Sequence, residues 1–486
     1  MPVTASVASM VVDSAKMRGA AARRSTWGGT MPVHGSKRQC RAALGAGMVW
    51  AILLAAGCAP LEKPADYMEP TGNHESPHPH RPELGLSEPE RADEEPIRVL
   101  NDRERARMEE YIAEHVEPED VVATIQLSKD ELVDCVRLDR QPSLRRPALQ
   151  GDAVRMEPPA GPREEPKETS PTLVDDPSGP IRVENTRLAY GAESRVCPER
   201  TIPVRRLTIE ILDNFETLED FLRARPPHAL TGPTDQHQYA YSYILVDSWG
   251  AQSTLNVWSP YTERASEFSL SQIAVTRGAG SDKETVESGW QKYRDLYGDY
   301  RPRLFIYFTP DNYGSGGCYN LTCSAFVQVN NSVYIGGGFT NISTHPHPST
   351  AWEFTIRWQR HGETGDWWLK YGDTWVGYYP SRLFDDDGLR PHGSKASFYG
   401  EIIDDEPERH TRTDMGSGHF PADGFGYAAY QRRIRTISTS NVWNVYPSLS
   451  ETRTDANCYD IDIRESSGDW ERYVYFGGPG YGTHCQ

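Results

Sequence analysis

The 486-residue chain is short of positive charge, because 51 Lys and Arg residues stand against 69 Asp and Glu residues, for a formal net charge of -18. Nucleic-acid binding needs clustered cations, so a nucleic-acid partner is disfavoured. The sequence also has neither a C-x-x-C nor an H-E-x-x-H motif, two common sources of zinc ligands. The sequence therefore gives little support for a metal site.

Long apolar runs are also missing, apart from one stretch at residues 42–56. Lys37, Arg38 and Arg41 precede it, and it ends in the segment LAAGC at Cys58. A basic segment, a short apolar stretch and small residues are typical of an export signal, and LAAGC resembles a bacterial lipobox. We expect residues 1–58 to be a leader with Cys58 as the lipidation site, giving an exported protein that is lipid-anchored in the bacterial envelope or secreted. An ordinary cleaved signal and an uncleaved anchor are the alternatives.

Composition changes along the rest of the chain indicate its organisation. Residues 59–96 are rich in Pro, Glu and His and poor in apolar residues, which predicts a flexible tether. Helical spacing follows at residues 97–116, with Asn101 or Asp102 as the cap and Pro118 as the stop. A second helix is predicted at residues 214–224, after a Pro/Glu-rich linker at 155–182.

From about residue 238 the residue pattern becomes typical of a β protein. Apolar and polar residues alternate in short runs, and Gly, Asn, Asp and Pro punctuate them. The clearest runs lie at residues 239–246, 304–308, 326–329 and 352–358. Many short strands with frequent turns predict an all-β fold, either an antiparallel β-sandwich or a barrel.

Ordered motifs in this half carry a resemblance to a known family. They are FSLSQI (268–273), VESGW (286–290), GCYNLTCSAFVQVNN (317–331), GDWWLKYGDTWVGYYPSRLF (365–384), YGEII (399–403), MGSGHFPADGFGYAAY (415–430) and YFGGPG (475–480). Together they resemble the neprosin family of glutamic prolyl endopeptidases. The segments DCV from Asp134 and CPERTIPVRR (197–206) resemble the activation peptide of that family.

The resemblance implies a small α+β pro-region at residues 97–230, followed by a catalytic β-sandwich at 231–486. It also implies an endopeptidase that uses two glutamates without a metal or cofactor and cleaves proline-rich proteins or peptides after proline. A pair of carboxyl groups works best at acidic pH, so we expect an acid-acting enzyme. The two catalytic glutamates of the family lie in its E-x-G-W and G-E-[VI] motifs, which places them here at Glu287 and Glu401.

A pair of carboxyl groups suits peptide hydrolysis, because two that share a site cannot both ionise cheaply. The charged one can take a proton from water, and the protonated one can stabilise the oxyanion or protonate the leaving nitrogen. We assign Glu401 as the base and Glu287 as its acidic partner. Gln238 is a rival candidate, since a fungal family of glutamic peptidases uses a Gln/Glu pair. Other strand glutamates, such as Glu267, Glu353 and Glu363, are expected to face solvent.

Six cysteines follow Cys58, and an even number in an exported chain indicates disulfides, for which 15 pairings are possible. We predict three bonds, namely Cys135–Cys197, Cys318–Cys323 and Cys458–Cys485. They would join the two ends of the pro-region, close a tight loop and tie back the C-terminus.

Two other function classes remain open. One is a β-sandwich envelope or binding protein without catalysis, although retention of both glutamates argues against it. The other is a carbohydrate-active enzyme, which would also use two carboxylates. Finally, the proline-rich stretch at 223–236 has the composition of an exposed loop, which predicts the site of a maturation cut.

Overall fold

The computed structural model describes residues 101–163, 173–174, 181–190, 196–223, 237–314, 316–344, 349–406 and 408–486. All of them belong to one compact unit of the chain. The predicted leader with Cys58, the predicted tether at 59–96 and residues 224–236 of the predicted maturation loop lie outside the described residues. Within the described ranges, no helix is long and apolar enough to cross a membrane.

The N-terminal part contains helices and a small sheet. Its helices are α1 (Asp102–His115), α2 (Ile209–Leu212) and α3 (Leu218–Arg223), and its antiparallel sheet comprises β1 (Val121–Ser128), β2 (Glu131–Arg137) and β5 (Thr201–Arg205). Of the two caps that the sequence offered, Asn101 caps α1, because its side chain accepts a hydrogen bond of 2.8 Å from the Glu104 amide. The second predicted helix is shorter than expected, because Thr217 caps it by accepting a hydrogen bond from the Asp220 amide.

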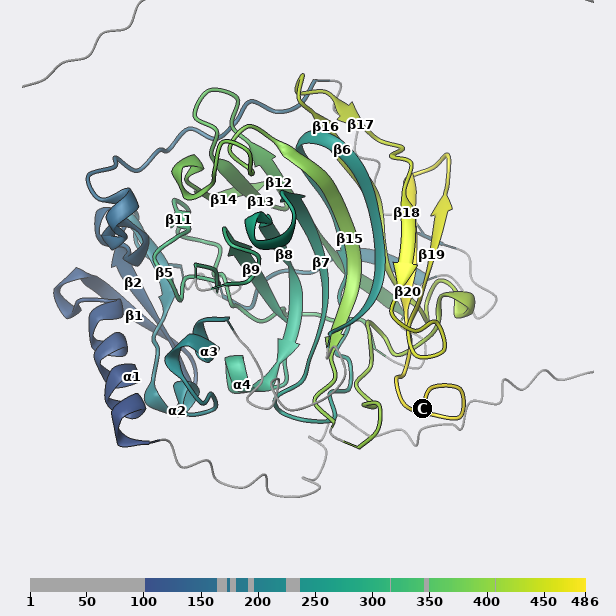
Figure 1. Cartoon of the computed structure of the whole chain (residues 1–486), viewed down its shortest axis with the longest axis horizontal. Helices are drawn as coiled ribbons and strands as arrows, with labels where there is room; N and C mark the ends of the chain where they lie inside the picture. Colours follow the sequence, from purple (N-terminus) through teal and green to yellow (C-terminus); the bar gives the residue numbers. More distant parts are fainter. Residues whose placement is uncertain are drawn as a thin grey trace, which may run out of the picture. The chain divides into compact units, whose positions relative to one another are not determined.

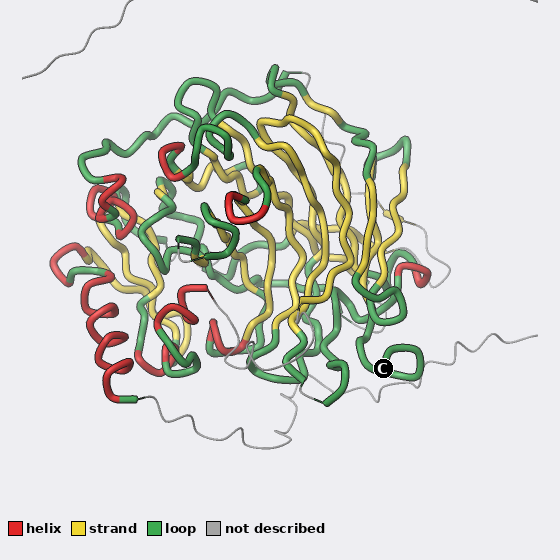
Figure 2. The backbone as a smooth tube through the Cα atoms, in the orientation of Figure 1, coloured by secondary structure: helices red, strands yellow, loops and turns green. Residues whose placement is uncertain are grey.

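Most of the remaining described residues form one large, curled and mainly antiparallel sheet system (Figures 1 and 2). One layer contains β6 (His237–Asn256), β7 (Phe268–Arg277), β8 (Glu284–Tyr293), β9 (Arg303–Thr309), β10 (Cys318–Tyr319), β15 (Gly393–Ile403) and β18 (Ser450–Arg453), and the short helix α4 (Arg294–Tyr297) follows β8. Figure 1 shows β6, β15, β7 and β8 curving side by side.

The second layer shares β6 with the first. It contains β3 (Leu173–Val174), β4 (Ile181–Asn185), β11 (Val327–Gln328), β12 (Thr350–Arg360), β13 (Trp367–Tyr371), β14 (Thr374–Tyr379), β16 (Ala429–Ser438), β17 (Trp443–Asn444), β19 (Asp460–Glu465) and β20 (Arg472–Gly477). The first half of β6 pairs with β15 and its second half pairs with β12 and β16, so this 20-residue strand passes from one layer into the other.

The main hydrophobic core lies between the two layers. Ile273, Val286 and Phe398 contribute to it from the first layer, and Ile356 and Trp358 from the second. All five side chains are fully buried. Because side chains alternate along a strand, the residues between these core positions on β7, β8 and β15 project from the opposite face of the first layer. The observed fold is therefore the antiparallel β-sandwich that the sequence predicted, preceded by a small α+β region.

The six described cysteines pair as Cys135–Cys197, Cys318–Cys323 and Cys458–Cys485, the pairing predicted above. No disulfide among the described residues joins the N-terminal region to the sandwich. That region is nevertheless integrated with it, because β4 pairs in parallel with β12 from Thr350 to Glu353. Residues of the predicted pro-region thus extend the second layer.

Candidate active site

The two predicted catalytic glutamates lie on the same face of the first layer. Glu287 is on β8 and Glu401 on β15, and β7 pairs with both strands. Along β7, Glu287 is opposite Ala274 and Glu401 is opposite Leu270. These two partners are four residues apart, an even number, so both glutamates project from the same side of the sheet. Tertiary structure thus brings together two motifs that are 114 positions apart in the chain.

Glu287 lies in a setting that favours its protonated form. Its side chain is 5 % exposed. Thr285 and Tyr313 each donate a hydroxyl hydrogen bond to its Oε1, at 2.7 and 2.8 Å. Burial raises the pKa of Glu287, the hydrogen bond from Thr285 opposes the rise, and the negative charge of Glu401 adds to it. The net result is a pKa above the ordinary value, as expected for the acid member of a carboxyl pair.

Glu401 is held through both of its oxygens. His237, the first residue of β6, places its Nδ1 2.6 Å from Oε1, and the side-chain amide of Gln272 donates to Oε2 at 3.4 Å. Glu401 is also buried, at 6 % exposed. The same Gln272 amide donates to the Tyr399 hydroxyl, so one side chain links Glu401 to its neighbour on β15.

Gln272 and Gly289 form the floor between the two glutamates. They are paired across β7 and β8, and Tyr399 is opposite Gln272 on β15. A Cβ at position 289 would lie 1.9 Å from the backbone oxygen of Ser271, so only glycine fits there. We did not single out Gln272 from the sequence, although it belongs to the FSLSQI motif at 268–273.

Tyrosines line the site face beyond Glu401. Tyr239, Tyr241 and Tyr243 alternate on β6 and pair with Glu401, Tyr399 and Ser397 of β15. The rings of Tyr241 and Tyr399 are 4.5 Å apart between centroids. Together with His237, these residues give the face an aromatic strip beside the carboxyl pair.

The N-terminal region covers the other end of this face. Phe215 and Phe221 belong to an apolar cluster that also contains Leu270, Phe305 and Tyr307 of the first layer. Leu270 is the β7 partner of Glu401, and Tyr307 is the β9 partner of Glu287. The cluster therefore reaches the strand positions opposite both glutamates.

An ion-pair network supports the same contact. Glu131 of β2 binds the buried Arg303 of β9 at 2.6 Å and Arg301 at 2.8 Å. Burial opposes ionisation of Glu131, but the hydrogen bonds and charge of Arg303 hold the pKa of Glu131 below its ordinary value. The carboxylate is thus charged when it pairs.

Three sequence expectations about other residues had different outcomes. Gln238 pairs with Ile402, a core residue, so it lies on the opposite face from Glu401 and is not part of the pair. Glu267 and Glu353 were expected to face solvent, and this was wrong. Glu267 is buried among Thr411, Thr413 and the Asp405 amide, and Glu353 forms an ion pair of 2.5 Å with Arg432. Glu363 is exposed, as predicted.

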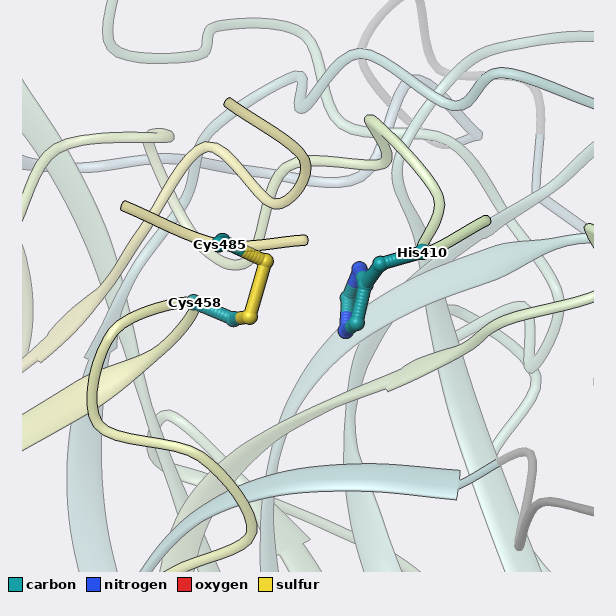
Figure 3. Close-up of side chains that lie close together, drawn as sticks. All are labelled: His410, Cys458 and Cys485. Atoms are coloured by element: carbon teal, nitrogen blue, oxygen red, sulfur yellow. A yellow bond between two sulfur atoms is a disulfide. The ribbon is translucent and has the colours of Figure 1, made fainter. Parts of the chain in front are cut away.

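One side-chain cluster and one pocket lie outside the carboxyl pair. His410, Cys458 and Cys485 lie close together, but the two sulfur atoms are bonded to each other, so neither is a thiolate ligand (Figure 3). A pocket lined by Val204, Tyr297 and Asn320, among other residues, contains no carboxyl group. Neither place offers the paired acid and base found on the first layer.

Comparison with known proteins agrees with the motifs. Residues 265–479, which include Glu287 and Glu401, match the Neprosin family. Among solved structures, this chain is similar to scytalido-glutamic peptidase with a peptide-based transition state analog (13 % identity over 51 % of this chain and 100 % of that chain, TM-score 0.29). It is also similar to SCP-B, a member of the eqolisin family of peptidases, in a complex with the tripeptide Ala-Ile-His (10 % identity over 50 % of this chain and 98 % of that chain, TM-score 0.26). These TM-scores are too low to support an inference about activity. Residues 265–479 of this chain thus carry a Neprosin domain.

Proposed function

We propose that this protein is a glutamic endopeptidase, made as an inactive precursor, that cleaves proline-containing peptides at acidic pH. Glu401 is its general base and Glu287 its general acid. One observation carries the proposal: two buried carboxyl groups share one face of a sheet, and the charge of Glu401 raises the pKa of Glu287. A pair of this kind holds one proton, which provides an acid and a base together.

The proposed reaction needs no group beyond these side chains, water and the peptide. Glu401 takes a proton from water as the water oxygen bonds to the peptide carbonyl carbon. The protonated Glu287 donates a hydrogen bond to the carbonyl oxygen, where negative charge develops. The tetrahedral intermediate then collapses, the C–N bond breaks, and Glu287 gives its proton to the leaving nitrogen. The proton that Glu401 took from water then passes to Glu287, which restores the pair.

Specificity for proline is part of the proposal, and the aromatic strip supports it. Tyr239, Tyr241 and Tyr399 present rings beside Glu401. Aromatic rings provide flat apolar surfaces on which a pyrrolidine ring can stack. The family resemblance implies cleavage after proline.

The inactive-precursor part of the proposal is supported by the N-terminal cover. Phe215 and Phe221 pack against the site face, and Glu131 anchors the small sheet to Arg303. His237 contacts Glu401 and directly follows the stretch predicted to be cut. A cut in that stretch would separate the catalytic half from the cover and from a lipid anchor at Cys58.

The decisive test uses acid-treated protein with a proline-containing peptide library, analysed by mass spectrometry. Glu287→Gln and Glu401→Gln should each lower the cleavage rate by about 10²–10⁴-fold, because each removes a proton-transfer group. Glu363→Gln, at an exposed position, is the matched control and should cleave at the normal rate. Full activity in either catalytic variant would exclude the carboxyl pair. Activity on polysaccharides alone would favour a carbohydrate-active enzyme.

Maturation is tested separately. The purified precursor is incubated at acidic and neutral pH, and the N-terminus of any shortened product is sequenced. We expect a cut between residues 223 and 236 in acid. A precursor that remains intact in acid and still cleaves proline peptides at the full rate would show that the N-terminal region is a permanent domain.

A further inference from the structure

The loop between β9 and β10 places Tyr313 in an unusual backbone conformation. Asn312 and Tyr313 have φ values of 53° and 60°, the left-handed region that asparagine tolerates but bulky residues rarely adopt. Hydrogen bonds hold them there. The Thr309 hydroxyl accepts from the Tyr313 amide at 2.7 Å, and the Lys283 carbonyl accepts from the Asn312 amide at 2.8 Å. Residues held by their surroundings in a strained backbone conformation cluster at functional sites, so the conformation indicates a functional role for Tyr313.

This conformation directs the Tyr313 hydroxyl to Glu287. The hydroxyl donates to Oε1 at 2.8 Å, and Thr285 donates to the same oxygen at 2.7 Å. The Tyr313 ring is stacked on Tyr307, at 5.8 Å between centroids, and the Lys283 ammonium lies 4.4 Å from its centre on a face of the ring. Among the described residues, the hydrogen bonds to Glu287 reach Oε1 alone.

We propose that Tyr313 is a positioning residue that, together with Thr285, fixes Glu287 so that Oε2 carries the proton and faces the substrate. A protonated carboxyl group whose one oxygen already accepts two hydrogen bonds keeps its proton on the other oxygen. Tyr313 therefore acts through Glu287 and does not itself touch the reacting atoms. This inference rests on the proposed peptidase function and adds to it a residue that orients the carboxyl group of Glu287.

Other groups also act on Glu287 and must be separated from Tyr313. Glu401 on β15 raises the pKa of Glu287, and Lys283, which precedes β8, lowers it. Burial raises the pKa values of Tyr241, Tyr379 and Tyr399, and the negative charge of Glu287 adds to the rise. Replacing Tyr313 by Phe leaves all these groups in place and removes one hydroxyl.

The expected direction follows from the hydrogen bond. The Tyr313 hydroxyl lowers the pKa of Glu287, so Tyr313→Phe should raise it. A net hydrogen bond of ordinary strength corresponds to a shift of about 0.5–1 pH unit. Because Glu287 is the acid, the alkaline limb of the kcat/KM profile should move up by the same amount. Loss of orientation should also lower kcat by about 10- to 100-fold, with a smaller change in KM.

The experiment compares wild-type protein, Tyr313→Phe and Thr285→Val by two readouts. The first is carboxyl titration by ¹³C NMR, with the Glu287 signal assigned from its loss in Glu287→Gln. The second is the pH profile of proline-peptide cleavage after acid maturation. Tyr371→Phe is the matched control, because its hydroxyl is buried without a hydrogen-bond partner among the described residues. We expect upward shifts in both test variants and none in the control.

The outcomes separate this inference from the proposed function. Unshifted titration and an unchanged pH profile in Tyr313→Phe, with active wild-type protein, would overturn the positioning role and leave the peptidase intact. Wild-type protein that cleaves no peptide would refute the proposed function and, with it, the positioning role. If Tyr313→Phe fails to fold, Thr285→Val decides, because it removes the second donor without touching the loop.

Discussion

Glu267 allows a quantitative prediction of how a buried carboxyl group changes the stability of this protein with pH. It lies in the linker directly before β7, fully buried, and accepts hydrogen bonds from the hydroxyls of Thr411 and Thr413 and from the Asp405 amide. Burial raises the pKa of Glu267 to about 8, although the hydrogen bonds oppose the rise. In the unfolded chain, a glutamate has a pKa of about 4.3. The folded protein therefore keeps a proton on Glu267 that the unfolded chain loses between these two values.

The sign and size of the effect follow from this difference. A raised pKa contributes stability that is fully present below about pH 4.3 and is lost as the pH rises to about 8. Between these limits each pH unit costs about 1.4 kcal/mol. From pH 5 to pH 7 the free energy of unfolding should therefore fall by about 3 kcal/mol through Glu267 alone. Glutamine does not titrate, so Glu267→Gln removes this dependence.

The assay is urea unfolding at pH 5, 6, 7 and 8, followed by tryptophan fluorescence in a Glu287→Gln background that prevents self-cleavage. We expect the stability difference between the parent and Glu267→Gln to shrink by about 3 kcal/mol from pH 5 to pH 7. Glu363→Gln, at an exposed position, should show a constant difference. A constant difference for Glu267→Gln as well would mean that Glu267 is ionised in the folded protein, and the reasoning would be refuted.

Two further predictions concern the floor and the cover of the site. Gly289→Ala should destabilise the protein by about 1–3 kcal/mol and reduce peptide cleavage, since its Cβ would meet a backbone oxygen at 1.9 Å. Thermal unfolding measures the change in stability. Gly362→Ala is the control, because a Cβ fits at that position. Glu131→Gln should let the precursor mature at a higher pH than wild type. In wild type, the ion pair of Glu131 with the buried Arg303 holds the N-terminal region in place, and its stabilising effect is lost only as the pH falls through the lowered pKa of Glu131. The variant lacks this ion pair at every pH. Gel analysis of precursor incubated over a pH series measures this, and an unchanged midpoint would contradict it.

Local patterns in the sequence were enough for much of the architecture. Alternation at 239–246, 304–308 and 352–358 predicted parts of β6, β9 and β12, because the two-residue period of a strand is a local property. Asn101 predicted the start of α1, since a cap needs only residues within one turn. The boundary of the second helix was harder to predict, because Thr217 caps α3, three residues after the predicted start at 214.

The motifs also identified Glu287 and Glu401 as the candidate pair, but the sequence could not say what surrounds each one. In the local sequence, nothing distinguishes Glu267 and Glu353 from exposed glutamates, yet their partners Thr413 and Arg432 lie 146 and 79 positions away. Burial and pairing are properties of such distant contacts, so local composition predicted solvent exposure where the fold has none.

By itself, the sequence determined the β character, since strand alternation depends on neighbouring residues, and its motifs indicated Glu287 and Glu401 as the candidate pair. The three cysteine pairs predicted from the sequence are those of the structure. Only the tertiary structure decided which strands are adjacent. That order of strands places Gln272 between Glu287 and Glu401, turns Gln238 to the opposite face and brings Tyr313 to Glu287. The position of β15 in this order depends on pairing with β6 and β7, which lie more than 100 residues away in the chain, and no local pattern encodes such pairing.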